Sequence, residues 1–193
     1  KTTSQTYKNR RLTWNYGADI MYDSLEDHFY TWKNVTGTNP SWDNADLACS
    51  KLNLLGLKGY LVTMQDKEEA HFMLKHIGNK LGWLGGSDKT KEDEWRWGEG
   101  PESTVDAGKG TLFTKGRGPT KQVIGYANWY ALEPNGDDYA QAGRHTDAEW
   151  ADRPNKDSSV TGFFCEFGGL GKSPNFDIEG EADMRPACRG FKE

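Results

Sequence analysis

The sequence lacks several features that mark large classes of protein. It has no run of about eighteen apolar residues, so none of its segments is expected to span a membrane. Its 24 basic residues are outnumbered by 29 acidic ones, and a net charge of −5 does not suit a nucleic-acid partner. Four histidines and three cysteines form no tetrahedral set of the kind that zinc requires. We therefore assign the chain to none of these three classes.

Large aromatic residues and glycines are, by contrast, abundant. Eight tryptophans and 23 glycines are typical of a loop-rich fold that packs a few large side chains. The length of 193 residues is enough for one domain with a sizeable core and some extension. Because the chain begins at Lys1, without a methionine or a signal peptide, we expect a processed form or a piece of a longer protein.

The three cysteines leave two interpretations open. Cys49 and Cys165 each lie in a strongly apolar context, and a bridge between them would stabilise the fold by about 4–5 kcal/mol. Cys188 would then be free or joined to a partner outside this chain. The alternative is three reduced, buried thiols in a cytosolic protein.

Two amphipathic helices are predicted in the first half of the chain. The first begins after the N-cap residue Ser41, and its inward face consists of Trp42, Ala45, Cys49 and Leu52. The second begins at Asp66, where Glu69 completes a capping-box arrangement, and its apolar stripe consists of Ala70, Met73, Leu74 and Ile77. His71 and His76 lie off that stripe, so we expect them at the surface.

Short strands and long loops account for the remainder. The strands are predicted near 28–30, 60–63, 82–86, 95–97 and 160–167. The glycine-rich stretch 98–125 has little periodicity apart from Leu112-Phe113, and it is predicted to be a long excursion. Two helices followed by short strands and long loops indicate the α+β class.

One loop concentrates oxygen-bearing side chains. Residues 133–138 have the sequence Glu-Pro-Asn-Gly-Asp-Asp, and Trp150-Ala151-Asp152 follows soon after. Such donors suit Ca²⁺, which takes about six to eight oxygen ligands in a flexible shell. A cis Glu133–Pro134 bond would direct the side chains on both sides of it toward one point. The alternative is ordinary turn chemistry in a solvated acidic loop.

Taken in order, the motifs of the chain resemble those of the C-type lectin-like domain. They are Trp42-x-x-Ala45-x-x-x-Cys49, Gly59-Tyr60-Leu61-Val62-Thr63, Glu69-x-x-Phe72, Trp83-Leu84-Gly85-Gly86-Ser87-Asp88, Trp95-x-Trp97, Asn128-Trp129, Glu133-Pro134-Asn135, Trp150-x-Asp152 and Cys165-Glu166. Each motif is weak alone, but the ordered series is specific and looks most like the lectin domains of large bacterial surface adhesins.

The resemblance implies a fold and a domain organisation. The expected fold is an α+β C-type lectin-like fold, with two helices flanking small antiparallel sheets and a long Ca²⁺-binding loop region. It would cover residues 27–169, between an N-terminal extension over 1–26 and a C-terminal extension or linker over 170–193. A Cys49–Cys165 disulfide would join the first helix to the last strand.

The resemblance also implies a Ca²⁺ cofactor and assigns its ligands. The principal ion would be held by Glu133, Asn135, Asp137 and Asp152, and the same residues would bind the sugar. An auxiliary ion would involve Asp88, Glu92, Asp137 and Asp138. In the family, Glu-Pro-Asn accompanies the vicinal diols of mannose, glucose, N-acetylglucosamine or fucose. One departure is Ala151, where the family usually has an asparagine.

The function implied is Ca²⁺-dependent carbohydrate binding in adhesion, without catalysis. The partners would be cell-surface glycans or monosaccharides, and the module would be secreted or at the cell surface, within a larger multidomain protein. The alternative is a Ca²⁺-stabilised domain of the same fold that binds protein or ice instead of sugar, and Ala151 keeps that alternative open. An enzyme is not expected, because no nucleophile–base pair accompanies the acidic loop.

Overall fold

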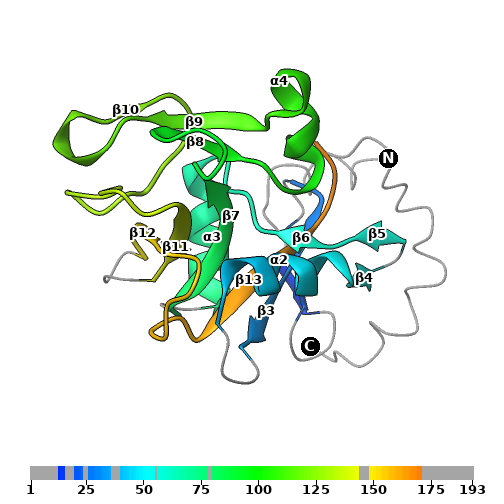
Figure 1. Ribbon diagram of the computed structural model, residues 1–193. Coiled ribbons are helices and arrows are strands. Elements are labelled where there is room, and N and C mark those ends of the chain that lie inside the picture. Colours follow the sequence, from blue (N-terminus) through cyan, green and yellow to red (C-terminus); the bar gives the residue numbers. More distant parts are fainter. Residues whose placement is uncertain are drawn as a thin grey trace, which may run out of the picture.

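The computed structural model describes residues 13–15, 20–23, 26–35, 40–54, 56–77, 80–143 and 148–170. Its elements are shown in Figure 1. They are β1 (Thr13–Asn15), β2 (Ile20–Asp23), β3 (His28–Asn34), α2 (Trp42–Ser50), β4 (Asn53–Leu54), β5 (Leu57–Lys58), β6 (Tyr60–Leu61), α3 (Lys67–Ile77), β7 (Gly82–Ser87), β8 (Glu94–Trp97), the 3-10 turn η1 (Gly100–Thr104), α4 (Val105–Gly108), β9 (Thr111–Lys115), the 3-10 turn η2 (Gly118–Thr120), β10 (Gln122–Val123), β11 (Tyr139–Ala142), β12 (Ala151–Arg153) and β13 (Gly162–Phe167). None of the helices in the described part of the chain has the length and apolar character needed to cross a bilayer.

The two predicted helices are confirmed, and their first turns are capped. In α2 the Ser41 hydroxyl accepts the amide of Asn44 at 3.3 Å. Before α3 the Asp66 carboxylate accepts the amide of Glu69 at 2.7 Å, but Glu69 reaches back to the amide of Gln65, 2.8 Å away, one residue earlier than a capping box requires. His71 is exposed as expected, whereas the side chain of His76 lies outside the described residues. The short helix α4 was not predicted.

The sheet is built around β13, the late strand that the sequence predicts. This strand pairs antiparallel with β3 and parallel with β7, and the strand order on the main path is β1-β2-β3-β13-β7-β8-β9-β10. β11 and β12 branch from β7 as an antiparallel pair. The predicted N-terminal extension over 1–26 includes β1 and β2, and β2 pairs with β3. Beyond Leu170 the predicted C-terminal extension lies outside the described residues.

The stretch 98–125 differs from the predicted featureless excursion. Its β9 pairs antiparallel with β8 and carries Phe113, which is buried and stacks on Trp97 with ring centroids 4.3 Å apart. A single core residue gives too little periodicity for the strand to be recognised from the sequence. The strand forms because β8 lies beside it and pairs with it. This excursion is therefore a layer of the domain, and it ends beside the oxygen-rich loop.

Aromatic packing holds that loop in place. Trp129 stacks near Phe113 and donates its indole hydrogen to the hydroxyl of Thr114 at 3.1 Å. Trp150 donates its amide to the carbonyl of Asn128 at 2.7 Å, and its own carbonyl accepts the amide of Tyr130 at 2.9 Å. The segment before Glu133 is thereby fastened alongside Trp150. The loop and Asp152 become neighbours because the residues on either side of Trp129 are hydrogen-bonded to Trp150.

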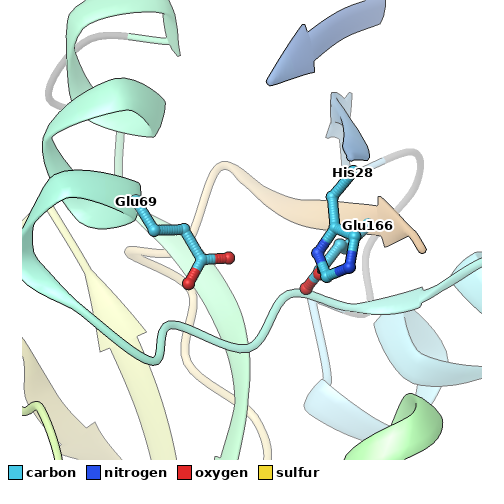
Figure 2. A group of neighbouring side chains, drawn as sticks. All are labelled: His28, Glu69 and Glu166. Atoms are coloured by element: carbon cyan, nitrogen blue, oxygen red, sulfur yellow. Dashed lines mark ion pairs between the residues drawn. The ribbon is translucent and has the colours of Figure 1, made fainter. Parts of the chain in front are cut away.

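A second group of polar side chains is buried among β3, α3 and β13. Figure 2 shows Glu69 of α3 directed toward His28 of β3 and Glu166 of β13. The His28 Nδ1 atom lies 2.6 Å from Glu166 Oε1, and Glu166 Oε2 accepts the amide of Thr63 at 2.9 Å. Glu69 Oε1 accepts the hydroxyl of Tyr30 at 2.8 Å. These bonds join β3, α3 and β13, and they leave several acidic groups in a region with little water.

Burial controls the protonation of this group. It raises the pKa of Glu69, and the Glu166 carboxylate adds to that effect. Burial, and next the charge of Glu166, raise the pKa of Glu102 to about 7. Burial lowers the pKa of His28, but the carboxylates of Glu166, Glu69 and Glu102 outweigh it and raise the pKa to about 9. All three groups therefore hold a proton more tightly in the folded chain than in the unfolded one.

In Ca²⁺-free buffer, stability is expected to fall as the pH rises. The stability that these protonated groups contribute is largest near pH 5. It is lost as the pH rises through the folded-state pKa values of about 7 for Glu102 and about 9 for His28. Urea unfolding in chelator at pH 5, 7 and 9 measures this. Glu102→Gln imitates the protonated acid and keeps an acceptor for Gln65, which now donates to Glu102 at 2.6 Å. The variant should show a shallower decline, and an unchanged slope would count against this assignment.

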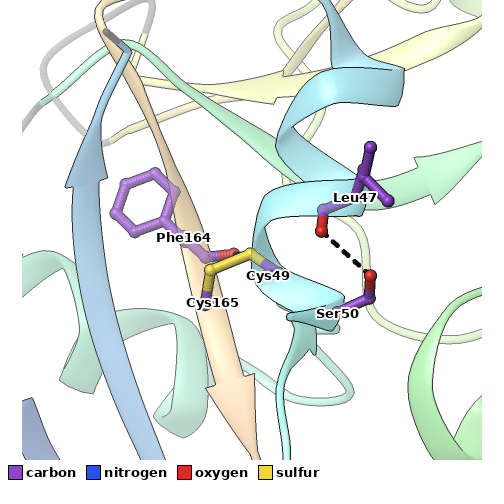
Figure 3. Close-up of a disulfide and its surroundings, with 5 residues drawn as sticks. All are labelled: Leu47, Cys49, Ser50, Phe164 and Cys165. Atoms are coloured by element: carbon purple, nitrogen blue, oxygen red, sulfur yellow. Dashed lines mark hydrogen bonds between the residues drawn. A yellow bond between two sulfur atoms is a disulfide. The ribbon is translucent and has the colours of Figure 1, made fainter. Parts of the chain in front are cut away.

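The predicted disulfide is confirmed. Cys49 of α2 is bonded to Cys165 of β13, and the two Cα atoms are 5.5 Å apart. Figure 3 shows the bridge crossing from the helix to the strand beside Phe164. Both cysteines are completely buried. Cys188 lies outside the described residues. The bridge ties the first helix directly to the central strand of the sheet.

Candidate functional site

The Glu133–Asp138 loop brings an acid and an amide together at its start. The Glu133–Pro134 peptide bond is cis. Asn135 Nδ2 donates to Glu133 Oε2 at 2.6 Å. Glu133 is buried at 6% exposure, whereas Asn135 is exposed. The loop therefore has one anchored carboxylate and one accessible amide, and the next residue, Gly136, has a φ of 134° that a side chain rarely adopts.

Asp152, at the centre of β12, holds this loop through hydrogen bonds to its backbone. Its Oδ2 atom accepts backbone amides from Asn135, Gly136 and Asp137 at 2.8, 2.7 and 2.7 Å. The Asp152 side chain is completely buried, and its Oδ1 atom has no hydrogen-bond partner among the described residues. A buried carboxylate oxygen without a partner is costly. A cation bound at Oδ1 would remove that cost, so the residue suits a metal.

Charged side chains adjoin the Glu133–Asp138 loop. Burial, and then the charges of Asp152, Asp138 and Asp157, raise the pKa of Asp137. The guanidinium of Arg153 offsets part of this negative charge, because it lies 3.9 Å from Glu133 Oε1 and 3.2 Å from Asp157 Oδ2. The site is thus short of positive charge around Asp137.

The second acidic cluster follows β7. Asp88, Glu92 and Asp93 each offer an oxygen, and these oxygens lie within 4.8 Å of one another. Asp88 is only 3% exposed, its Oδ2 atom accepts the amide of Asp93 at 2.9 Å, and its Oδ1 atom has no hydrogen-bond partner among the described residues. Burial, and then the charges of Glu92 and Asp138, raise the pKa of Asp88 to about 7. This cluster also fits a cation.

The two clusters meet at Asp138. Its carbonyl accepts the amide of Asp88 at 3.1 Å, which joins the oxygen-rich loop to the end of β7. Of the predicted auxiliary set, Asp88 and Glu92 therefore lie together with Asp93, and the backbone of Asp138 is bonded to Asp88. Among the described residues, groups of three His, Cys, Asp or Glu ligand atoms within 4.8 Å comprise this cluster and His28–Glu69–Glu166. Glu133, Asp137 and Asp152 are spaced more widely than that.

Sequence reasoning missed two arginines at the site. Arg153 follows Asp152 directly, and its charge could have signalled an acidic neighbour. Arg117 donates to Asp93 Oδ1 at 2.7 Å and to Glu92 Oε1 at 2.5 Å. It lies between two glycines in the stretch 98–125, where no local pattern indicates its partners.

The position of Ala151 is buried in the β11–β12 pair. Ala151 is completely buried and lies opposite Gln141. Because its side chain is a methyl group, it offers no oxygen to the site. Nearby Asn155 could supply an amide oxygen in its place, but it donates to Asp43 Oδ2 at 2.6 Å and accepts the Asp43 amide at 3.2 Å. Its amide is thus engaged at the start of α2.

Comparison with known proteins identifies relatives of this chain. Residues 38–167 match the Lectin C-type domain family. Halomucin of Haloquadratum walsbyi is 30% identical over 161 residues, which cover 81% of this chain and 2% of halomucin. The chain also matches only part of two further relatives. It spans 20% of the low affinity immunoglobulin epsilon Fc receptor of Mus musculus and 40% of C-type lectin domain family 10 member A of Homo sapiens.

Solved structures share the fold at low sequence identity. A mutant of the lectin CEL-I from Cucumaria echinata, described as the EPNH mutant, superposes with a TM-score of 0.54 at 21% identity, and the match covers 81% of this chain and 100% of that one. A calcium-independent type II antifreeze protein has a TM-score of 0.55 at 19% identity, covering 83% and 99%. At such identities these structures establish the fold alone.

Proposed function

Because the chain belongs to the C-type lectin domain family, we propose that it is a Ca²⁺-dependent carbohydrate-binding module. The observation that carries this proposal is the completely buried Asp152, whose Oδ1 atom has no hydrogen-bond partner among the described residues. Asp152 is bonded to the backbone of the loop in which the side chains of Glu133 and Asn135 contact each other. The Asp88 Oδ1 atom in the neighbouring cluster, which also lacks a hydrogen-bond partner in the part of the chain that the structure describes, supports a second cation.

Glu133, Asn135, Asp137 and Asp152 would hold the principal ion, and Asp88, Glu92, Asp137 and Asp138 would contribute to the auxiliary one. When bound, Ca²⁺ supplies coordination positions for two vicinal hydroxyls of a sugar. Glu133 would accept a hydrogen bond from one hydroxyl, and the exposed Asn135 amide would donate to the other. Asp152 holds the loop in this arrangement through its three backbone amide bonds. We propose mannose, glucose or fucose type diols as the ligands.

The setting that we propose is outside the cell. A buried disulfide between Cys49 and Cys165 is typical of oxidising compartments. The match to only 2% of halomucin supports a place as one module of a large protein, and we propose that this protein lies at the cell surface and mediates adhesion. The family to which the chain belongs consists of binding modules, and we propose no catalytic activity.

A second candidate is a Ca²⁺-stabilised domain that binds protein or ice and no sugar. The buried Ala151 favours it, because the site lacks one side-chain oxygen there. Glycan-array binding with and without Ca²⁺ separates the two candidates. The first requires saccharide binding that chelator abolishes. The second shows Ca²⁺-dependent melting without any saccharide response.

Exchanging the acid and amide of the loop should change sugar preference. Glu133→Gln combined with Asn135→Asp reverses which residue accepts and which donates, so galactose-type diols should gain at least tenfold on mannose-type diols, which is about 1.4 kcal/mol of discrimination. Monosaccharide inhibition of glycan binding measures the ratio. Ca²⁺-dependent melting checks that the variant still binds the ion. An unchanged preference in a variant that binds Ca²⁺ would contradict sugar reading by this loop.

A further inference from the structure

Arg117 reaches from the turn between β9 and β10 into the acidic loop after β7. Its Nε atom donates to Asp93 Oδ1 at 2.7 Å, and its Nη2 atom donates to Glu92 Oε1 at 2.5 Å. Glu92 and Asp93 are two of the three acids whose oxygens cluster within 4.8 Å. The guanidinium of Arg117 therefore binds two acids of the cluster that fits an auxiliary ion.

The surrounding backbone keeps Arg117 between the two candidate metal sites. The amide of Gly116 donates to the Asp93 carbonyl at 2.8 Å, and the amide of Gly118 donates to the Pro134 carbonyl at 2.7 Å. A Cβ atom on Gly136 would lie 3.1 Å from Arg117 Nη1, so the guanidinium also lies against the Glu133–Asp138 loop. The turn that carries Arg117 is thus fastened to both acidic segments.

Arg117 satisfies only the outer acids of the cluster. Glu92 and Asp93 are about half exposed, whereas Asp88 is buried and its Oδ1 atom has no hydrogen-bond partner among the described residues. A divalent ion held by Asp88 would draw on the oxygens of Glu92 and Asp93. Those oxygens would then be shared with, or released by, the guanidinium.

We propose that Arg117 is a tethered competitor of Ca²⁺ at the Asp88–Glu92–Asp93 cluster. It neutralises the outer acids and holds the loop when Ca²⁺ is scarce, and it lowers the affinity of the cluster for the ion. This inference rests on the proposed Ca²⁺ binding and deepens it. The side chains of Arg117, Glu92 and Asp93 are partly exposed, so solvent screening makes the effect moderate.

Isothermal titration of the metal-free chain with CaCl₂ tests the competition. Arg117→Gln should bind the auxiliary ion about three- to tenfold more tightly than the natural sequence at low salt. The difference should shrink at about 0.5 M NaCl, where ion pairs at the surface are screened. Arg117→Lys keeps the charge but not the two-pronged contact, so its affinity should lie between the two.

Lys115→Gln is the matched control. Lys115 is an exposed residue of β9 whose charge acts on Glu94, so this variant removes one positive charge from the same hairpin. It should bind Ca²⁺ nearly as the natural sequence does. Equal gains in Lys115→Gln and Arg117→Gln would mean that net charge alone sets affinity and would overturn the proposal.

The remaining outcomes separate the inference from the proposed function. If the natural sequence binds Ca²⁺ and Arg117→Gln binds it equally or more weakly, Arg117 is no competitor, while the proposed function stands. If both chains bind one ion and only Arg117→Gln binds a second, the competition is supported in its strongest form and the proposed function stands. If neither chain binds Ca²⁺ by titration or by a shift in melting temperature, both proposals are wrong.

Discussion

Replacing both Cys49 and Cys165 with alanine is expected to lower the free energy of unfolding by about 4–5 kcal/mol, because the disulfide closes a loop with a sequence separation of 116. The bridge constrains the unfolded chain by about 1.5–2 kcal/mol more than a loop of about 15 residues would, and it joins α2 to the central strand β13. A domain of this size is stable by only about 5–15 kcal/mol, so the loss should be a large fraction of its total stability.

Urea unfolding of the variant and of the natural sequence measures the loss, with Cys188→Ala in both chains to prevent thiol exchange. Reducing the natural sequence should reproduce most of the effect, whereas reductant should leave the double variant unchanged. A loss below about 1 kcal/mol would show that the buried contacts of α2 hold the helix without the covalent bond.

Elements with strong local signals could be predicted from the sequence. The helix that begins after Ser41 combines an N-cap with apolar residues spaced for one face, and both signals act within a few residues of each other. β13 is an apolar run, and its fully buried pattern follows from its place between β3 and β7. The disulfide was predictable only through the family resemblance, because spacing does not identify which cysteines pair.

Elements that depend on distant contacts could not be predicted. β9 has a single large core residue, Phe113, and it becomes a strand because β8 lies beside it. The partners of Arg117 come from a loop more than twenty residues earlier in the chain, as the separations of 24 and 25 to Asp93 and Glu92 show. The buried pair of His28 and Glu166 likewise joins opposite ends of the domain.

The candidate site was predictable as a set of residue types, but its internal support was not. The sequence indicates Glu133, Asn135, Asp137 and Asp152 as oxygen donors. It does not show that Asp152 spends one carboxylate oxygen on three backbone amides and keeps the other without a hydrogen-bond partner among the described residues. Because the two carboxylate oxygens differ in this way, Asp152 has a structural role as well as a proposed metal-binding one, and the two roles can be measured separately.

Asp152→Ala and Asp152→Asn should therefore differ in chelator. Alanine removes the acceptor of three backbone amides in a buried position, so we expect a loss of about 2–4 kcal/mol even without metal. Asparagine keeps one acceptor oxygen and should lose about 1 kcal/mol. Urea unfolding in chelator compares the two variants with the natural sequence. Equal small losses in both would mean that the loop does not depend on these bonds.

In Ca²⁺ the asparagine variant isolates the role of the charge. At a Ca²⁺ concentration one hundred times the dissociation constant, the natural sequence should gain about 2.7 kcal/mol of stability over its value in chelator. Asp152→Asn should lose most of that gain, because a neutral amide replaces the buried carboxylate whose Oδ1 atom has no hydrogen-bond partner within the described ranges. Arg153→Gln, which removes a neighbouring cation instead, should keep the gain. If Asp152→Asn were stabilised by Ca²⁺ as much as the natural sequence, the principal ion would have to bind elsewhere, and the Asp88 cluster would then be the site that carries the Ca²⁺ dependence.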